Sequence, residues 1–146
     1  MAPTLVNVEQ HNSLPASALN AAVTVPAEAP WVRTVRHFTS VVLSRWAVSG
    51  DDLDTSLLIV SELAGNSVLH GRADLAVLLS LQDHVLSITV MDSGAATEHA
   101  SAPTPSAGHE HGRGLDIVAA LADRCETHPK PSGWRTRICM RIATVP

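Results

Sequence analysis

Residues 61–71, SELAGNSVLHG, carry three polar side chains at intervals of four residues within an otherwise apolar stretch. A helix rises about 1.5 Å and turns about 100° per residue, so Glu62 and Asn66 share one stripe about 6 Å apart along the axis. This stripe borders an apolar row, and the carboxylate and the amide could therefore line a cavity. Taken alone, such a pair is more typical of a solvated helix face.

Two further fragments have residue types suited to binding. VMDSG, at residues 90–94, brings Asp92 to the end of an apolar strand, and Gly94 removes a side chain where another group must approach closely. Taken alone, Asp-Ser-Gly is more typical of a turn. GRGL, at residues 112–115, opens a helix, and its glycines let backbone N–H groups and the helix dipole face an anion such as phosphate. The alternative for GRGL is a hinged helix start.

The elements that must position these fragments follow from hydrophobic periodicity. Residues 1–20 predict a flexible tail, and residues 21–146 predict one domain. Within the domain we expect a strand at 21–25, helices at 31–48 and 51–69, a hairpin at 73–92 and a helix from 112. A last hairpin is expected at 124–143, with Pro129 and Gly133 bounding the segment that joins its two strands. Residues 95–111 are expected to form a lid.

The second helix is expected to bury one stripe and to end before Gly71. The residues of this stripe are Leu53, Leu57, Val60, Ala64 and Val68. The element order predicts an α+β fold: a two-layer sandwich with a mixed or antiparallel sheet and its helices on one face.

Composition excludes several classes of function. The formal charge is −4 and the pI near 6.0, which argues against nucleic acid or anionic lipid as partners. No apolar run reaches the roughly 20 residues that cross a bilayer, so we expect a cytoplasmic protein. Cys125 and Cys139 are expected to be reduced, although a turn near Ser132 could bring them opposite each other on a hairpin.

Together the three fragments resemble the GHKL superfamily, whose ATP site is the Bergerat fold, and within it the stand-alone bacterial anti-sigma-factor serine kinases. SELAGNSVLHG is similar to the N box, VMDSG to the first glycine box and HGRGLDIV to the second, over residues 21–145. The chain lacks the dimerisation helices and phosphoacceptor domain of two-component histidine kinases, so histidine autophosphorylation is not implied. Gly65 departs from a good helix sequence and costs up to about 1 kcal/mol unless close packing requires it.

The resemblance implies a role for each motif residue. Asp92 would accept a hydrogen bond from the adenine amine, Gly94 would leave room for the ring, and Thr136 would lie near the base. Asn66 would bind Mg²⁺ through its amide oxygen, and Glu62 would be the general base. The triphosphate would be held by the second glycine box, whose residues are Gly112, Arg113, Gly114 and Leu115.

The function implied is an ATP- and Mg²⁺-dependent serine/threonine protein kinase that phosphorylates an antagonist protein and sequesters a sigma factor. The exposed face of the first helix is a candidate dimer surface. Two alternatives stay open: a nucleotide-gated binding module without phosphotransfer, and an adaptor with an inactive pocket. His109, Glu110 and His111 suggest a metal site, but two histidines in a loop supply only half of one.

Overall fold

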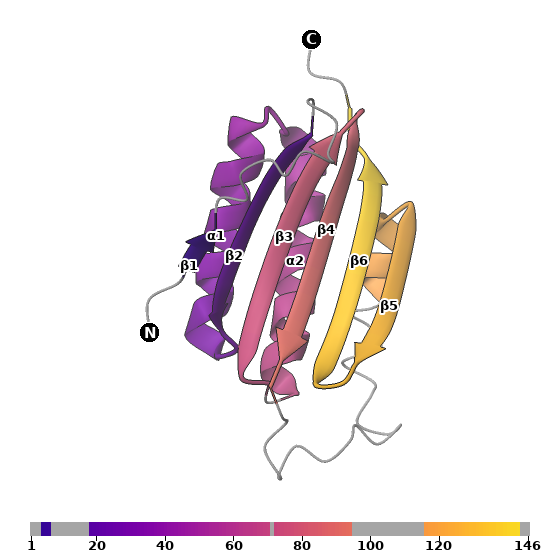
Figure 1. Cartoon of the computed structure of the whole chain (residues 1–146). Helices are drawn as coiled ribbons and strands as arrows, with labels where there is room; N and C mark the ends of the chain where they lie inside the picture. Colours follow the sequence, from indigo (N-terminus) through magenta and orange to yellow (C-terminus); the bar gives the residue numbers. More distant parts are fainter. Residues whose placement is uncertain (1–3, 7–17, 71, 95–115, 144–146) are drawn as a thin grey trace.

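The fold is a six-stranded antiparallel sheet with helices packed on one face (Figure 1). The computed structural model describes residues 4–6, 18–70, 72–94 and 116–143. The strand order is β1-β2-β3-β4-β6-β5, and every neighbouring pair is antiparallel. The predicted α+β sandwich is therefore confirmed, and the sheet is antiparallel throughout.

The N-terminal part of the sheet differs from the prediction. The strand β2 spans Leu19–Pro26, longer than the five residues expected. A short strand, β1 (Thr4–Val6), pairs with β2 inside the segment predicted to be a flexible tail. Three residues that gain stability only by pairing with a neighbour carry no periodicity of their own, so the sequence gives no signal for β1.

Two helices, α1 (Ala29–Arg45) and α2 (Gly50–Leu69), follow β2. Pro30 lies in the first turn of α1, where the missing N–H is tolerated. The helix ends earlier than predicted, because Ala47 adopts a positive φ of 62° and the chain turns before α2. The helix α2 ends at Leu69 as predicted, while Gly71 lies outside the described residues.

The buried face of α2 is rotated from the predicted stripe. Leu53, Leu57 and Val68 are only half-buried. The buried residues are Ser56, Ile59, Val60, Leu63, Ala64 and Ser67. The face is broader because α2 packs against both α1 and the sheet, and this brings Asn66 next to buried residues.

Two hairpins complete the sheet. The strands β3 (Asp74–Gln82) and β4 (Val85–Ser93) are joined by Asp83 and His84, which have φ values of 50° and 63°. Two positive φ values in a two-residue connection define a type I′ turn. The strand β5 (Arg124–Lys130) precedes β6 (Gly133–Arg141) and includes Pro129, which was predicted to lie in the turn; proline is tolerated there because β5 is an edge strand.

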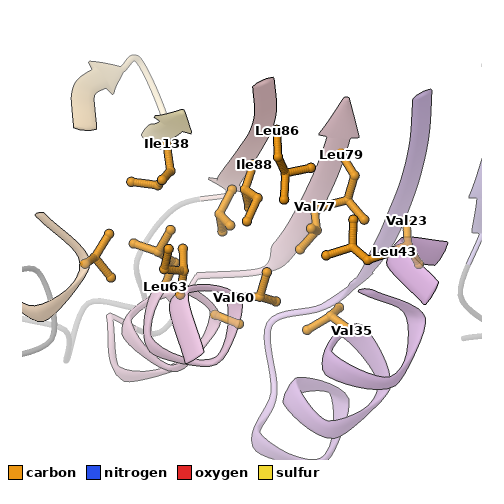
Figure 2. Close-up of a cluster of buried hydrophobic side chains, with 14 of the residues drawn as sticks. Val23, Val35, Leu43, Val60, Leu63, Val77, Leu79, Leu86, Ile88 and Ile138 are labelled. Carbon is orange, nitrogen blue, oxygen red and sulfur yellow. The ribbon is translucent and has the colours of Figure 1, made fainter. Parts of the chain in front are cut away.

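The core lies between the sheet and the helices (Figure 2). Alternate residues of each strand face the helices, as Val77 and Leu79 on β3 and Leu86 and Ile88 on β4 illustrate. Residues 116–121 are helical, and Val118 among them is fully buried in the same core. This element is the helix predicted to follow the second glycine box.

The register of the last hairpin shows whether Cys125 and Cys139 can form a disulfide. Cys125 lies opposite Ile138, and Cys139 lies opposite Arg124. The two cysteines are therefore offset by one residue and project from opposite faces of the sheet, so the hairpin does not bring them into bonding position. Both thiols are free. None of the described helices is long and apolar enough to cross a bilayer.

Candidate functional site

Asp92 is a carboxylate at the buried end of β4. It continues the row of inward-facing residues formed by Leu86, Ile88 and Val90, and it is only 5% exposed. Burying a charge is expensive unless other groups compensate it. The groups around Asp92 are therefore expected to compensate its charge.

Three separate elements supply groups around Asp92. The Ser67 hydroxyl on α2 donates a hydrogen bond to Oδ2 at 2.9 Å, and the backbone N–H of Trp134 on β6 donates to Oδ1 at 2.8 Å. Between α2 and β3, Arg72 places Nε 3.5 Å from Oδ1. The carboxylate is thus held from three sides and compensated by one positive charge.

The contacts described above use fewer acceptor positions than the Asp92 carboxylate offers. A carboxylate offers about four acceptor positions, two on each oxygen. Trp134 and Arg72 face Oδ1, whereas Ser67 donates its hydrogen bond to Oδ2. One acceptor position on Oδ2 thus suits an external N–H donor, such as the exocyclic amine of adenine.

Two glycines allow the backbone to pack closely around Asp92. A Cβ on Gly133 (φ +152°) would lie 2.2 Å from the Asp92 carbonyl oxygen and 2.6 Å from Oδ1. A Cβ on Gly94 (φ +94°) would lie 2.3 Å from the Cβ of Ala73. The close approach predicted at Gly94 is therefore present, and the group that approaches is the chain before β3.

Glu62 and Asn66 lie beside the buried face of α2, and both are half-buried. Asn66 directly precedes Ser67, the residue that contacts Asp92, so Asn66 lies at the Asp92 end of the helix. Glu62 lies one turn further away, about 6 Å along the axis. The helix therefore presents, in order from Asp92, an amide and then a second carboxylate.

Thr136 lies near Asp92 on the same face of the sheet. It is opposite Val90 on one side and Thr127 on the other, and it is 7% exposed. Its Oγ1 is 3.3 Å from that of Thr127. Because Val90 is two residues from Asp92 along β4, Thr136 lines the sheet beside the carboxylate.

Only some of the residues predicted to bind phosphate and Mg²⁺ lie within the described part of the chain. Gly112, Arg113, Gly114 and Leu115 lie outside them, as do the predicted lid at 95–111 and the residues His109, Glu110 and His111. Among the residues that are described, no cluster of three His, Cys, Asp or Glu side chains could hold a metal ion. The amide oxygen of Asn66 fits Mg²⁺ as a single hard ligand, since Mg²⁺ usually keeps several waters and phosphate oxygens.

Sequence reasoning missed Ser67, Arg72, Gly133 and the backbone N–H of Trp134. Ser67 had a readable signal, because it is a polar residue at a core position of α2 that needs a partner. Gly133 was predicted only as part of the turn, without its close contact with Asp92. Arg72 and Trp134 gave no signal, because their contacts with Asp92 depend on how three distant segments meet.

Comparisons with known proteins agree with this arrangement. Residues 25–142 match the family model of the histidine kinase-like ATPase domain. Among solved structures, the chain is similar to the crystal structure of the RsbU and RsbW domains of Rv1364c from Mycobacterium tuberculosis, with a TM-score of 0.65 and 20% identity. That match covers 88% of this chain and 33% of the other.

The chain thus spans about a third of the length of that structure, and the likeness concerns the fold. A search of curated proteins found no match. The family match covers the helix with Glu62 and Asn66, the strand with Asp92 and the strand with Thr136. The chain belongs to the family of histidine kinase-like ATPase domains, the GHKL fold predicted from its motifs.

Proposed function

We propose that this protein is an ATP- and Mg²⁺-dependent serine/threonine kinase that phosphorylates an antagonist protein and sequesters a sigma factor, thereby regulating transcription in the cytoplasm. The observation that carries the proposal is the order of groups from the buried Asp92 carboxylate to Asn66 and Glu62 on α2. This order matches a nucleotide lying along the helix with its base at Asp92. The partners are those implied by the resemblance to anti-sigma-factor kinases, and the solved structure with an RsbW domain shares the fold.

In this proposal Asp92 recognises adenine through the open acceptor position of Oδ2. The positive Arg72 and the Ser67 and Trp134 donors keep the carboxylate in place. Thr136 lies beside the base. The glycine box, with Gly112, Arg113, Gly114 and Leu115, holds the phosphates at a helix N-terminus.

At the other end of the nucleotide, Asn66 contributes an oxygen ligand to Mg²⁺, which when bound neutralises charge on the phosphates. Glu62 accepts the proton of a serine or threonine hydroxyl on the antagonist. The hydroxyl oxygen forms a bond to the γ-phosphorus, the bond from that phosphorus to the bridging oxygen breaks, and ADP leaves. Glu62 thus acts as general base.

The test is phosphotransfer from labelled ATP to candidate antagonist proteins by wild type and Glu62→Gln. The substitution keeps the size of the side chain but removes its basicity. General-base catalysis contributes about 10²–10⁴-fold, so the labelling rate should fall by about that factor while ATP binding stays unchanged. ATP binding without any transfer to the antagonists, or equal rates for both proteins, would instead favour a nucleotide-gated binding module.

A further inference from the structure

The face of the sheet opposite the helices carries a concentration of positive charge. On β6, Arg135, Arg137 and Arg141 lie opposite Met91, Thr89 and Val85 of β4. Alternate residues of a strand share a face, and the intervening Thr136, Ile138 and Met140 are buried toward the helices. The three arginines therefore point away from the core, and all three are exposed.

The neighbouring strand β5 extends this charge. Arg124 lies opposite Cys139 and Lys130 opposite Gly133, which places both on the outward face. We name Arg124, Lys130, Arg135, Arg137 and Arg141 the basic strip. The chain has ten Lys and Arg residues and a net charge of −4, so half of its basic residues lie on this part of the sheet.

Most of the basic strip forms no salt bridge within the described chain, although Glu126 lies opposite Arg137 on the outward face. Glu126, the acidic residue of β5 and β6, lies 2.6 Å from Arg124 and 3.9 Å from His128. In the described parts of the chain, Arg135, Arg137 and Arg141 form no salt bridge. Arg135 and Arg137 are neighbours on one face of β6, so their guanidinium groups repel each other, and an anionic ligand would relieve this repulsion. Arginine can also bind a carboxylate through two parallel hydrogen bonds.

The surface next to the basic strip indicates whether its anionic partner is a protein or a nucleic acid. Among the outward-facing residues of the adjoining strands, Asp74 at the start of β3 is acidic, and the others, which include Ala76, Leu78, Thr89 and Met91, are uncharged. No helix of the described chain covers them, because α1 and α2 lie behind the sheet (Figure 1). An uncharged centre bordered by arginine is typical of a protein interface, whereas a nucleic-acid-binding domain is usually basic as a whole.

We propose that the basic strip docks an acidic segment of a partner protein in extended conformation. Arg135 and Arg137 are two residues apart along β6, about 6.6–6.8 Å, and an extended acidic segment spaces its alternate carboxylates equally. Asp92 and the buried row of β4 face the helices, so this surface lies on the opposite side of the sheet from the nucleotide site. The docking surface is therefore independent of the proposed kinase activity.

The test measures binding of a fluorescent peptide of alternating Glu and Ser by anisotropy. The variant Arg135→Glu/Arg137→Glu should lose at least about tenfold in affinity, equivalent to about 1.4 kcal/mol. The matched control is Arg33→Glu/Arg36→Glu, which makes the same charge change on exposed residues of α1 and should bind the peptide like wild type. Circular dichroism and thermal melting establish that both variants are folded.

Several results would overturn the proposal. An equal loss in both charge-reversal variants would show that only net charge matters. Tighter binding of a DNA duplex than of the peptide would assign the strip to nucleic acid, and a change of oligomeric state in the strip variant would assign it to a second copy. Peptide binding should persist in Asp92→Asn, so a failure at the nucleotide site is distinguishable from a failure here.

Discussion

The Nε atom of Arg72 lies 3.5 Å from Oδ1 of the buried Asp92, and the two side chains form the one ion pair at the proposed base-binding end of the site in the described chain. The Nε atom is buried without a hydrogen bond from the residues described. Its contribution to the site is therefore charge compensation, since the distance is too long for a good hydrogen bond.

Arg72→Met should lower the free energy of unfolding by about 3 kcal/mol, because it leaves the buried Asp92 without a compensating charge. Asp92→Asn in the same chain removes that uncompensated charge, so the double variant should lose less than the sum of the single variants. Urea unfolding of all four proteins measures the coupling. Strictly additive losses would show that the two groups do not interact.

Gly133→Ala should destabilise the protein by about 2 kcal/mol or more, through a strained backbone and a clash with Asp92. The added methyl group would lie 2.2 Å from the Asp92 carbonyl oxygen, so β6 must move away from β4. This movement would also weaken the Trp134 N–H bond to Asp92 and reduce ATP affinity. Unchanged melting and unchanged ATP affinity would contradict the close packing at this position.

Gly65→Ala, unlike Gly133→Ala, should stabilise the protein. No described atom lies within 4 Å of a Cβ built on Gly65, so the close packing that would require glycine is absent from the described chain. Alanine in a helix interior is favoured over glycine by about 0.5–1 kcal/mol, and the midpoint of urea unfolding should rise accordingly. A fall in the midpoint would mean that Gly65 is needed for packing after all.

Much of this fold follows from the sequence, because the long helices and hairpins have clear periodicity. The end of α2 at Leu69 and the pairing of β3 with β4 were predicted. The rotation of the buried face of α2 was not, because it depends on simultaneous packing against α1 and the sheet. Asp92 was identified by its place at a strand end, but Ser67, Arg72 and Trp134 required the three-dimensional arrangement.

Cys125 should titrate at a higher pH in the folded protein than in the unfolded chain, because burial raises the pKa of its thiol despite the opposing hydrogen bond with Thr127. A raised pKa favours the neutral thiol, so this contribution to stability is present at neutral pH and is lost as the pH rises through the folded value. Iodoacetamide alkylation in a Cys139→Ser background, with and without urea, gives the two midpoints. A folded midpoint at or below the unfolded one would contradict the burial effect.

We propose that Asp92 recognises the base of ATP through an acceptor position on Oδ2. Calorimetric titration of wild type and Asp92→Asn with ATP in the presence of Mg²⁺ tests it most directly, with Gly65→Ala as a folded control outside the carboxylate network. A hydrogen bond to a charged group contributes about 1.5–3 kcal/mol, so Asp92→Asn should weaken ATP binding by about 10–150-fold. Equal affinities of the two proteins, or no ATP binding by wild type, would rule out base recognition by Asp92.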